Sequence, residues 1–163
     1  MKGLEESIED LQKLQAEGVE LLTDLGVTED EDKNLPCVLI LEDDKVSSFM
    51  LAKLVKKMGC RVRIYENPLK ALVDAKDFKV ALLFLDMKLP EMNGLDFLVK
   101  LREVQKSSEF AVVVVTGYTQ KSVVDNIIKH NVKGILAKPL NLERAIKFVQ
   151  NFGAEAKIKE ATA

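Results

Sequence analysis

The sequence predicts a doubly wound α/β domain, in which parallel strands form a central sheet with helices on both faces. Three observations support this fold class. Short apolar segments alternate with longer amphipathic segments five times between about residues 36 and 152. Most of the apolar segments lack in–out alternation, which is typical of strands buried on both faces of a parallel sheet. Four of them also run directly into polar or charged residues.

The first two strand–helix units occupy about residues 37–75. Cys37–Leu41 is predicted to be a buried strand. Residues 61–65 alternate in polarity, as an edge strand does, with Val62 and Ile64 inward. Asn67 and Pro68 predict the N-cap and first turn of a helix that ends near Ala75. The helix between the two strands is predicted to turn an apolar stripe inward, made of Val46, Met50, Leu54 and Met58 and widened by Phe49, Leu51 and Val55.

Three further units follow the same pattern. Their strands are predicted at residues 80–85, 111–115 and 134–137. Their helices are predicted at about 95–105, at about 122–130, and from an Asn141 N-cap onward. Five units of this kind form a single doubly wound domain.

The two ends of the chain differ from this pattern. Residues 1–26 predict an amphipathic helix, whose stripe weakens at Gln15 and Gly18. It either packs on the domain or forms a coiled coil with a second copy or a partner. Residues 28–34 are highly charged and predict a linker. We therefore divide the chain into an N-terminal helix and acidic linker (1–34), a folded domain (35–153) and a tail (154–163). The stripe of the N-terminal helix comprises Leu4, Ile8, Leu11, Leu22 and Leu25.

Composition narrows the classes of function. With 47% hydrophobic and 31% charged residues, the 163-residue chain suits one globular domain with an appendage. No apolar run approaches the roughly 20 residues of a membrane-spanning helix. The net charge of −2 gives no overall reason to expect binding to nucleic acid or an anionic membrane. The acidic N-terminus is unlike a secretory signal, so we expect a cytoplasmic protein. His130 is the only histidine, which excludes histidine-clustered metal sites within this chain.

The residues that end the predicted strands carry the chemistry. Glu42 and Asp43 end the first strand, Asp86 the third, Thr116 the fourth and Lys138 the fifth. Parallel strands bring such residues to one edge of the sheet. If the first and third strands are neighbours, about 4.8 Å apart, their carboxylates repel and raise one another's pKa unless a cation lies among them. A hard divalent ion with oxygen ligands, Mg²⁺, is the natural counter-charge.

Taken alone, Asp86 could simply cap a turn. Together with Mg²⁺, a hydroxyl and a lysine, it meets the needs of phosphoryl transfer onto a carboxylate. The attack spreads negative charge over three oxygens. Mg²⁺, the Lys138 ammonium and the Thr116 hydroxyl with nearby N–H groups can each neutralise one of them.

Four motifs resemble the receiver domain of two-component response regulators: LILEDD, LFLDMKLPEMNG, VVVTG and LAKP. The resemblance covers about Pro36–Phe152 and implies a flavodoxin-like, five-stranded sheet in the order 2-1-3-4-5. It implies that Asp86 is the phosphoacceptor, with Thr116 as the switch hydroxyl and Lys138 in the family's lysine–proline pair, whose peptide bond is usually cis.

The same resemblance implies the magnesium ligands. Asp43 would bind the ion directly, Glu42 would act through water or as a second acidic ligand, and the Lys88 backbone carbonyl would join Asp86 to complete the protein ligands. Such a domain is not an enzyme with a separate substrate, because it catalyses only its own phosphorylation and dephosphorylation. Lys88 and Tyr118 lie where the family tunes the phosphoryl lifetime, and they predict slow autodephosphorylation.

The resemblance also implies partners. The donor would be a histidine kinase or a histidine phosphotransfer protein, and the output would pass to a downstream protein. A homodimer could form through the N-terminal helix or the face of the domain's fourth and fifth helices. Ile135 stands where the family commonly has Tyr or Phe, which leaves a phosphate-independent interaction module as an alternative.

Two other interpretations fit less well. A flavin- or nucleotide-binding module would need a glycine-rich loop after the first strand, whereas the acidic run from Glu42 to Asp44 repels phosphate. A phosphohydrolase of the haloacid dehalogenase type would need a second aspartate two residues after the nucleophile, where this chain has Lys88.

Overall fold

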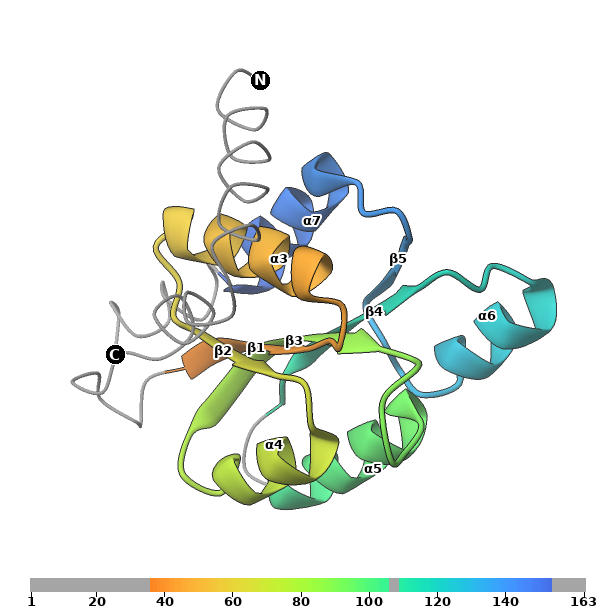
Figure 1. Cartoon of the computed structure of the whole chain (residues 1–163), viewed down its shortest axis with the longest axis horizontal. Coiled ribbons are helices and arrows are strands. Elements are labelled where there is room, and N and C mark those ends of the chain that lie inside the picture. Colours follow the sequence, from red (N-terminus) through yellow and green to blue (C-terminus); the bar gives the residue numbers. More distant parts are fainter. Residues whose placement is uncertain (1–35, 106–108, 154–163) are drawn as a thin grey trace.

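A sheet of five parallel strands forms the centre of the computed structural model, which describes residues 36–105 and 109–153 (Figure 1). The strands are β1 (Pro36–Leu41), β2 (Val62–Tyr65), β3 (Lys79–Asp86), β4 (Ala111–Thr116) and β5 (Gly134–Ala137). Their order is β2-β1-β3-β4-β5. The predicted fold class and strand order are therefore confirmed. The predicted N-terminal helix, acidic linker and C-terminal tail lie outside the described residues, and the domain boundaries stay predictions.

Helices cover both faces of the sheet (Figure 1). One face carries α3 (Lys45–Lys57) and α7 (Leu142–Phe148), which continues into the π-helical turn η1 (Val149–Gly153). The other face carries α4 (Pro68–Asp74), α5 (Gly94–Val104) and α6 (Lys121–Ile128). Among the described residues, no helix is both long and apolar enough to cross a membrane.

The layered arrangement explains why the central strands are apolar throughout. In β1, Val38 and Ile40 pack under α3 and α7, whereas Leu39 and Leu41 point to the opposite core. Consecutive residues of a strand face opposite sides of the sheet, so a strand with helices on both sides needs apolar residues at every position.

Asparagine caps begin three of the helices. The Asn67 side chain accepts hydrogen bonds from the N–H groups of Leu69 and Lys70, and Asn141 accepts one from Arg144. These two caps confirm the helix starts predicted from the sequence. Asn93 caps α5 in the same way.

One detail of the predicted core was wrong, because Val46 and Met50 in α3 are only half-buried. Ile64 in β2 packs against the core as predicted, although it is half-buried. The helix has apolar residues at two overlapping spacings, and the inner stripe is the one centred on Leu51 and Val55. Strand β2 forms the edge of the sheet, where burial is incomplete.

Gln105, just beyond α5, ties the two helices of one face to the sheet. It is buried, and its Nε2 donates hydrogen bonds to the carbonyl oxygens of Ala75 (2.6 Å) and Phe78 (2.8 Å). Its Oε1 accepts a hydrogen bond from the Val80 N–H at 3.2 Å. One side chain thereby satisfies three backbone groups around the turn that leads into β3.

Substitution Gln105→Leu should destabilise the domain by about 2–4 kcal/mol, because it leaves buried backbone groups without these hydrogen bonds. Chemical denaturation measures this as a lower midpoint. The matched control is Glu103→Leu at an exposed position of the same helix, where a change within about 0.5 kcal/mol is expected. Equal midpoints for the two variants would contradict the role given to Gln105.

Candidate functional site

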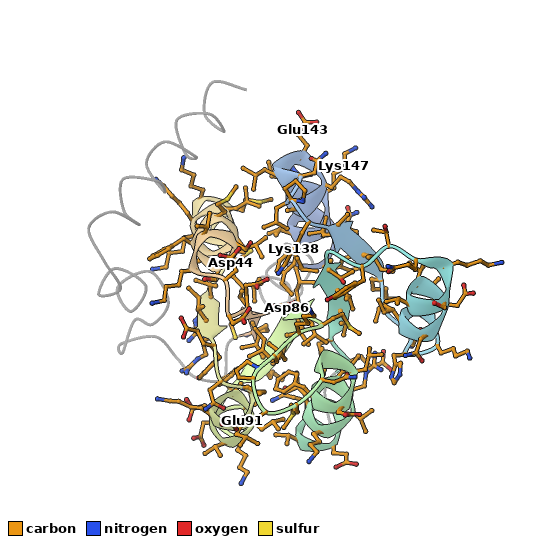
Figure 2. The ribbon with its side chains drawn as sticks, turned by 45° about the vertical axis from the view of Figure 1, so that its right-hand side comes forward. Asp44, Asp86, Glu91, Lys138, Glu143 and Lys147 are labelled. Carbon is orange, nitrogen blue, oxygen red and sulfur yellow. The ribbon has the colours of Figure 1, made fainter. Side chains whose placement is uncertain are left out.

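The carboxyl edge of the sheet gathers the residues that end its strands. Leu41 pairs with Leu85 between β1 and β3, and Thr116 pairs with Ala137 between β4 and β5. The residues that follow in the chain therefore converge above the sheet. Figure 2 shows Lys138 approaching Asp86, with Asp44 close by at the start of α3. In the same view, Glu91 belongs to the loop after β3 and lies away from Asp86.

Three carboxylates form the centre of this site. One oxygen atom from each of Glu42, Asp43 and Asp86 lies within 4.8 Å of the others. Glu42 is 1% exposed and Asp86 is 4% exposed, whereas Asp43 is exposed. The structure thus brings together the three carboxylates that were predicted to meet at this edge of the sheet.

Lys138 supplies the positive charge. Its Nζ lies 3.0 Å from Glu42 Oε1 and 3.5 Å from Asp86 Oδ2. Burial alone would lower the pKa of Lys138, but its hydrogen bond to Glu42 and the charges of Glu42 and Asp86 outweigh burial and raise that pKa. Its backbone N–H donates to the Thr116 carbonyl at 2.9 Å, and the following bond to Pro139 is cis, as the resemblance implied.

Burial and the closeness of the carboxyl groups raise the pKa of two of them. Burial, followed by the adjacent Asp86 carboxyl, raises the pKa of Glu42 to about 8, in spite of the opposing effect of Lys138. Burial and Asp86 also raise the pKa of Asp43. Without a metal ion, the negative charge of the three carboxylates is therefore greater than the positive charge that Lys138 supplies.

One buried oxygen shows that the residues fit a metal ion. Glu42 Oε1 accepts hydrogen bonds from the Asp44 N–H at 3.1 Å and from Lys138. Glu42 Oε2 is also buried, and it has no hydrogen-bond partner within the described part of the chain. A buried carboxylate oxygen without a partner lowers the stability of the folded state unless a hydrogen-bond donor or a cation binds it. Together with the oxygens of Asp43 and Asp86, it suits a hard divalent cation.

The loop after β3 shapes the other side of Asp86. Asp86 Oδ1 accepts the Lys88 N–H at 3.1 Å. The Gly94 N–H donates to the Met87 carbonyl at 3.1 Å, and a side chain at position 94 would collide with the Asp86 carbonyl oxygen. Glycine is therefore required for the loop to close on the strand. The contact observed for Lys88 is through its N–H, and the expected role of its carbonyl as a metal ligand stays a prediction.

Thr116 and Tyr118 complete the rim. The Thr116 hydroxyl is buried and accepts the Tyr118 N–H at 3.0 Å. The Lys88 ammonium lies 4.8 Å from the centre of the Tyr118 ring, a cation–π contact that joins the loops after β3 and β4. Sequence analysis had singled out both residues but had not placed them in contact.

Asp44 has a structural role that the sequence analysis did not assign. Its Oδ1 accepts the Val46 N–H at 3.2 Å, and its Oδ2 accepts the Ser47 hydroxyl at 2.8 Å. It is the N-cap of α3 and not a member of the carboxylate cluster. The signal was present in the sequence, because aspartate is a preferred N-cap residue and Asp44 directly precedes the helix.

Comparison with known proteins agrees with this geometry. The family model described as the response regulator receiver domain matches residues 38–150. The chain belongs to the response regulator receiver domain family. A curated relative of this receiver domain is the polar-differentiation response regulator DivK of Brucella anthropi, which is 24% identical over 119 residues, covering 73% of this chain and 97% of DivK.

Solved structures resemble the receiver domain as well. A CheY-like receiver domain protein from Methanospirillum hungatei JF-1 has a TM-score of 0.65 at 20% identity and covers 80% of this chain and 100% of its own. A response regulator from Burkholderia pseudomallei has a TM-score of 0.62 at 27% identity and covers 78% of this chain and 74% of its own. The Burkholderia structure contains a phosphorylated aspartic acid, a calcium ion and citrate.

Substitution Glu42→Gln should change the pH dependence of stability in the metal-free protein. The folded-state pKa of Glu42 is raised from 4.5 to about 8, so its contribution to stability is fully present below pH 4.5 and is lost as the pH rises through 8. Glutamine does not ionise, so the variant does not lose stability in this way as the pH rises. Its melting temperature relative to wild type should therefore rise by about 3 °C or more between pH 5 and pH 8.5.

Thermal unfolding in the presence of a chelator measures this difference. Glu66→Gln, at an exposed position, is the control and should show a constant difference from wild type over the same range. A constant or falling difference for Glu42→Gln would show that the Glu42 carboxyl is not destabilised in the folded site.

Proposed function

We propose that this receiver domain accepts a phosphoryl group on Asp86 in a Mg²⁺-dependent reaction and transmits the change through protein–protein contacts. One observation carries the proposal. Asp86 lies at the end of a buried strand between a lysine ammonium at 3.5 Å and two further carboxylates. One of these carboxylates has a buried oxygen without a hydrogen-bond partner in the described ranges 36–105 and 109–153. The phosphorylated aspartic acid in the Burkholderia relative supports the same chemistry here.

The reaction follows from the arrangement of the side chains. An Asp86 carboxylate oxygen attacks the phosphorus atom of the donor, the bond from phosphorus to the donor's imidazole nitrogen breaks, and that nitrogen keeps the electron pair. The product is a mixed anhydride on Asp86. Lys138 neutralises one phosphoryl oxygen, and the Thr116 hydroxyl donates a hydrogen bond to a second. Mg²⁺ held by Glu42, Asp43, Asp86 and the Lys88 carbonyl would neutralise the third.

Partners follow from the same chemistry. The phosphoryl donor is a histidine kinase or a histidine phosphotransfer protein in the cytoplasm, and the signal passes from this domain to a downstream protein. The domain catalyses only its own phosphorylation and dephosphorylation, and it needs no direct contact with nucleic acid or membrane. The N-terminal segment, or the face formed by α6 and α7, offers a surface for a homodimer.

Ile135 supports the alternative of a phosphate-independent interaction module. It lies half-buried in β5 where the family commonly has an aromatic residue, and its carbonyl accepts a hydrogen bond from Arg144 at 3.3 Å. In this alternative, the domain keeps the receiver fold and binds a partner protein but no longer accepts a phosphoryl group.

Incubation with acetyl phosphate and Mg²⁺ should add one phosphoryl group to the wild-type chain, as measured by intact mass. The adduct should be absent without Mg²⁺ and in Asp86→Asn, because each removes a required participant. Asp96→Asn, at an exposed site on α5, is the matched control and should be modified like wild type. Absence of any adduct on folded wild-type protein would favour the interaction module.

The Lys88–Tyr118 contact should slow hydrolysis of the adduct by shielding it from water. Loss of this exposed cation–π contact should admit water to the site, and we expect hydrolysis about 2- to 5-fold faster in Lys88→Ala and in Tyr118→Ala. Decay of the intact-mass adduct measures the rate, and Lys121→Ala on α6 is the control. A wild-type lifetime of only seconds, or variants that decay at the wild-type rate, would contradict this shielding.

A further inference from the structure

The charge of this chain is divided unevenly along its length. Residues 1–34 hold eleven acidic residues against three lysines, a net charge of −8, so the remaining residues carry +6. Much of the positive charge falls on one stretch. Residues 45–65, which contain α3 and β2, have no acidic residue and six basic ones. These six are Lys45, Lys53, Lys56, Lys57, Arg61 and Arg63.

Four of these side chains form what we call the basic surface: Lys53, Lys56, Lys57 and Arg61. Lys53 lies three and four residues before Lys56 and Lys57 on α3, so the three lysines share one side of the helix. Arg61 directly precedes β2, and its carbonyl accepts the Val38 N–H at 2.8 Å. Lys57 is exposed and the other three are half-buried.

Helix polarity accounts for only part of this cluster. Cations in the last turn of a helix are favoured by its dipole, which suits Lys56 and Lys57. It does not account for Lys53, one turn earlier, or for Arg61, beyond the helix. Like charges three and four residues apart repel one another, and an acidic segment beside them reduces that repulsion.

The basic surface lies away from the phosphoacceptor site. Strand β1 begins at Pro36 and runs toward Glu42, and α3 returns from Lys45 to Lys57. The last turns of α3 and the start of β2 are therefore beside the beginning of β1, at the edge of the sheet opposite Asp86. The chain enters the domain at this same edge.

We propose that the acidic N-terminal segment, residues 1–34, docks on the basic surface of its own domain. The charges are complementary, and the attachment point at Pro36 is next to the surface. Residues 28–35 can span at most about 28 Å, so they keep the preceding residues tethered near the point where the chain enters the domain. Tethering at this length gives a high effective concentration, so weak ion pairs suffice to hold it.

The sequence of the segment fits this role. Glu17, Glu20 and Asp24 lie close to the linker, and their separations of three and four residues would place them on one side of a helix. Docking adds to the proposed function and does not depend on it, because neither Asp86 nor its partners take part.

Carbodiimide coupling of the full-length chain tests the proposal, because it joins a carboxylate to a lysine amine only where the two are in contact. An equal mixture of ¹⁴N- and ¹⁵N-labelled protein separates links within a chain from links between chains. We expect links within one chain from residues 1–34 to Lys53, Lys56 or Lys57, reduced at least fivefold in 0.5 M NaCl by charge screening. The proposal would be overturned if the exposed lysines near α6, Lys121, Lys129 and Lys133, were coupled to residues 1–34 as often as the lysines of α3. Links that join a ¹⁴N chain to a ¹⁵N chain would also overturn it, because they indicate docking on a second copy. The absence of any link would overturn it too.

Hydrogen exchange provides a second measurement. Amides of residues 4–25 should exchange at least tenfold faster in Lys53→Gln/Lys56→Gln/Lys57→Gln than in wild type. The control, Lys121→Gln/Lys129→Gln/Lys133→Gln, should match wild type. Circular dichroism verifies that both variants fold. If one variant does not fold, the coupling experiment still tests the proposal, because it uses the wild-type protein. Equal exchange in all three proteins would overturn the proposal.

Discussion

The ammonium group of Lys138 between Glu42 and Asp86 is the interaction on which the site depends. Parallel strands force the ends of β1 and β3 together, and both end in buried carboxylates. Repulsion between such groups is tolerable only with a cation among them. One lysine cannot neutralise three carboxylates. Burial and the adjacent Asp86 raise the Glu42 pKa, and one Glu42 oxygen has no hydrogen-bond partner among the residues that the structure describes. The site is thereby prepared for additional positive charge.

Much of the fold and the membership of the acidic site could be predicted from the sequence, because the signals are local. Continuous apolar runs marked strands covered on both faces, and the fifth strand was predicted at its observed bounds, Gly134–Ala137. Asn67 and Asn141 marked helix starts. The rule that parallel strands end at one edge then brought Glu42, Asp86 and Lys138 together without any coordinates.

The remaining features depend on how distant segments pack. Which apolar residues of α3 face inward is decided by the sheet beneath it, so periodicity alone grouped the half-buried Val46 and Met50 with the buried residues of the helix. The Gln105 hydrogen bonds reach 25 to 30 residues along the chain. The Lys88–Tyr118 contact joins two separate loops. Asp44 shows a different failure, because its position in an acidic run obscured its role as a helix cap.

The most direct test of this account is calorimetric titration of the metal-free protein with Mg²⁺ at pH 7, repeated in two buffers of different ionisation enthalpy. Because the Glu42 pKa is about 8 without metal, the site holds a proton that a bound cation should displace. The account predicts one bound ion with net proton release, and Glu42→Gln should release less. No binding, or binding with no proton release, would contradict the claim that crowded carboxylates create this site.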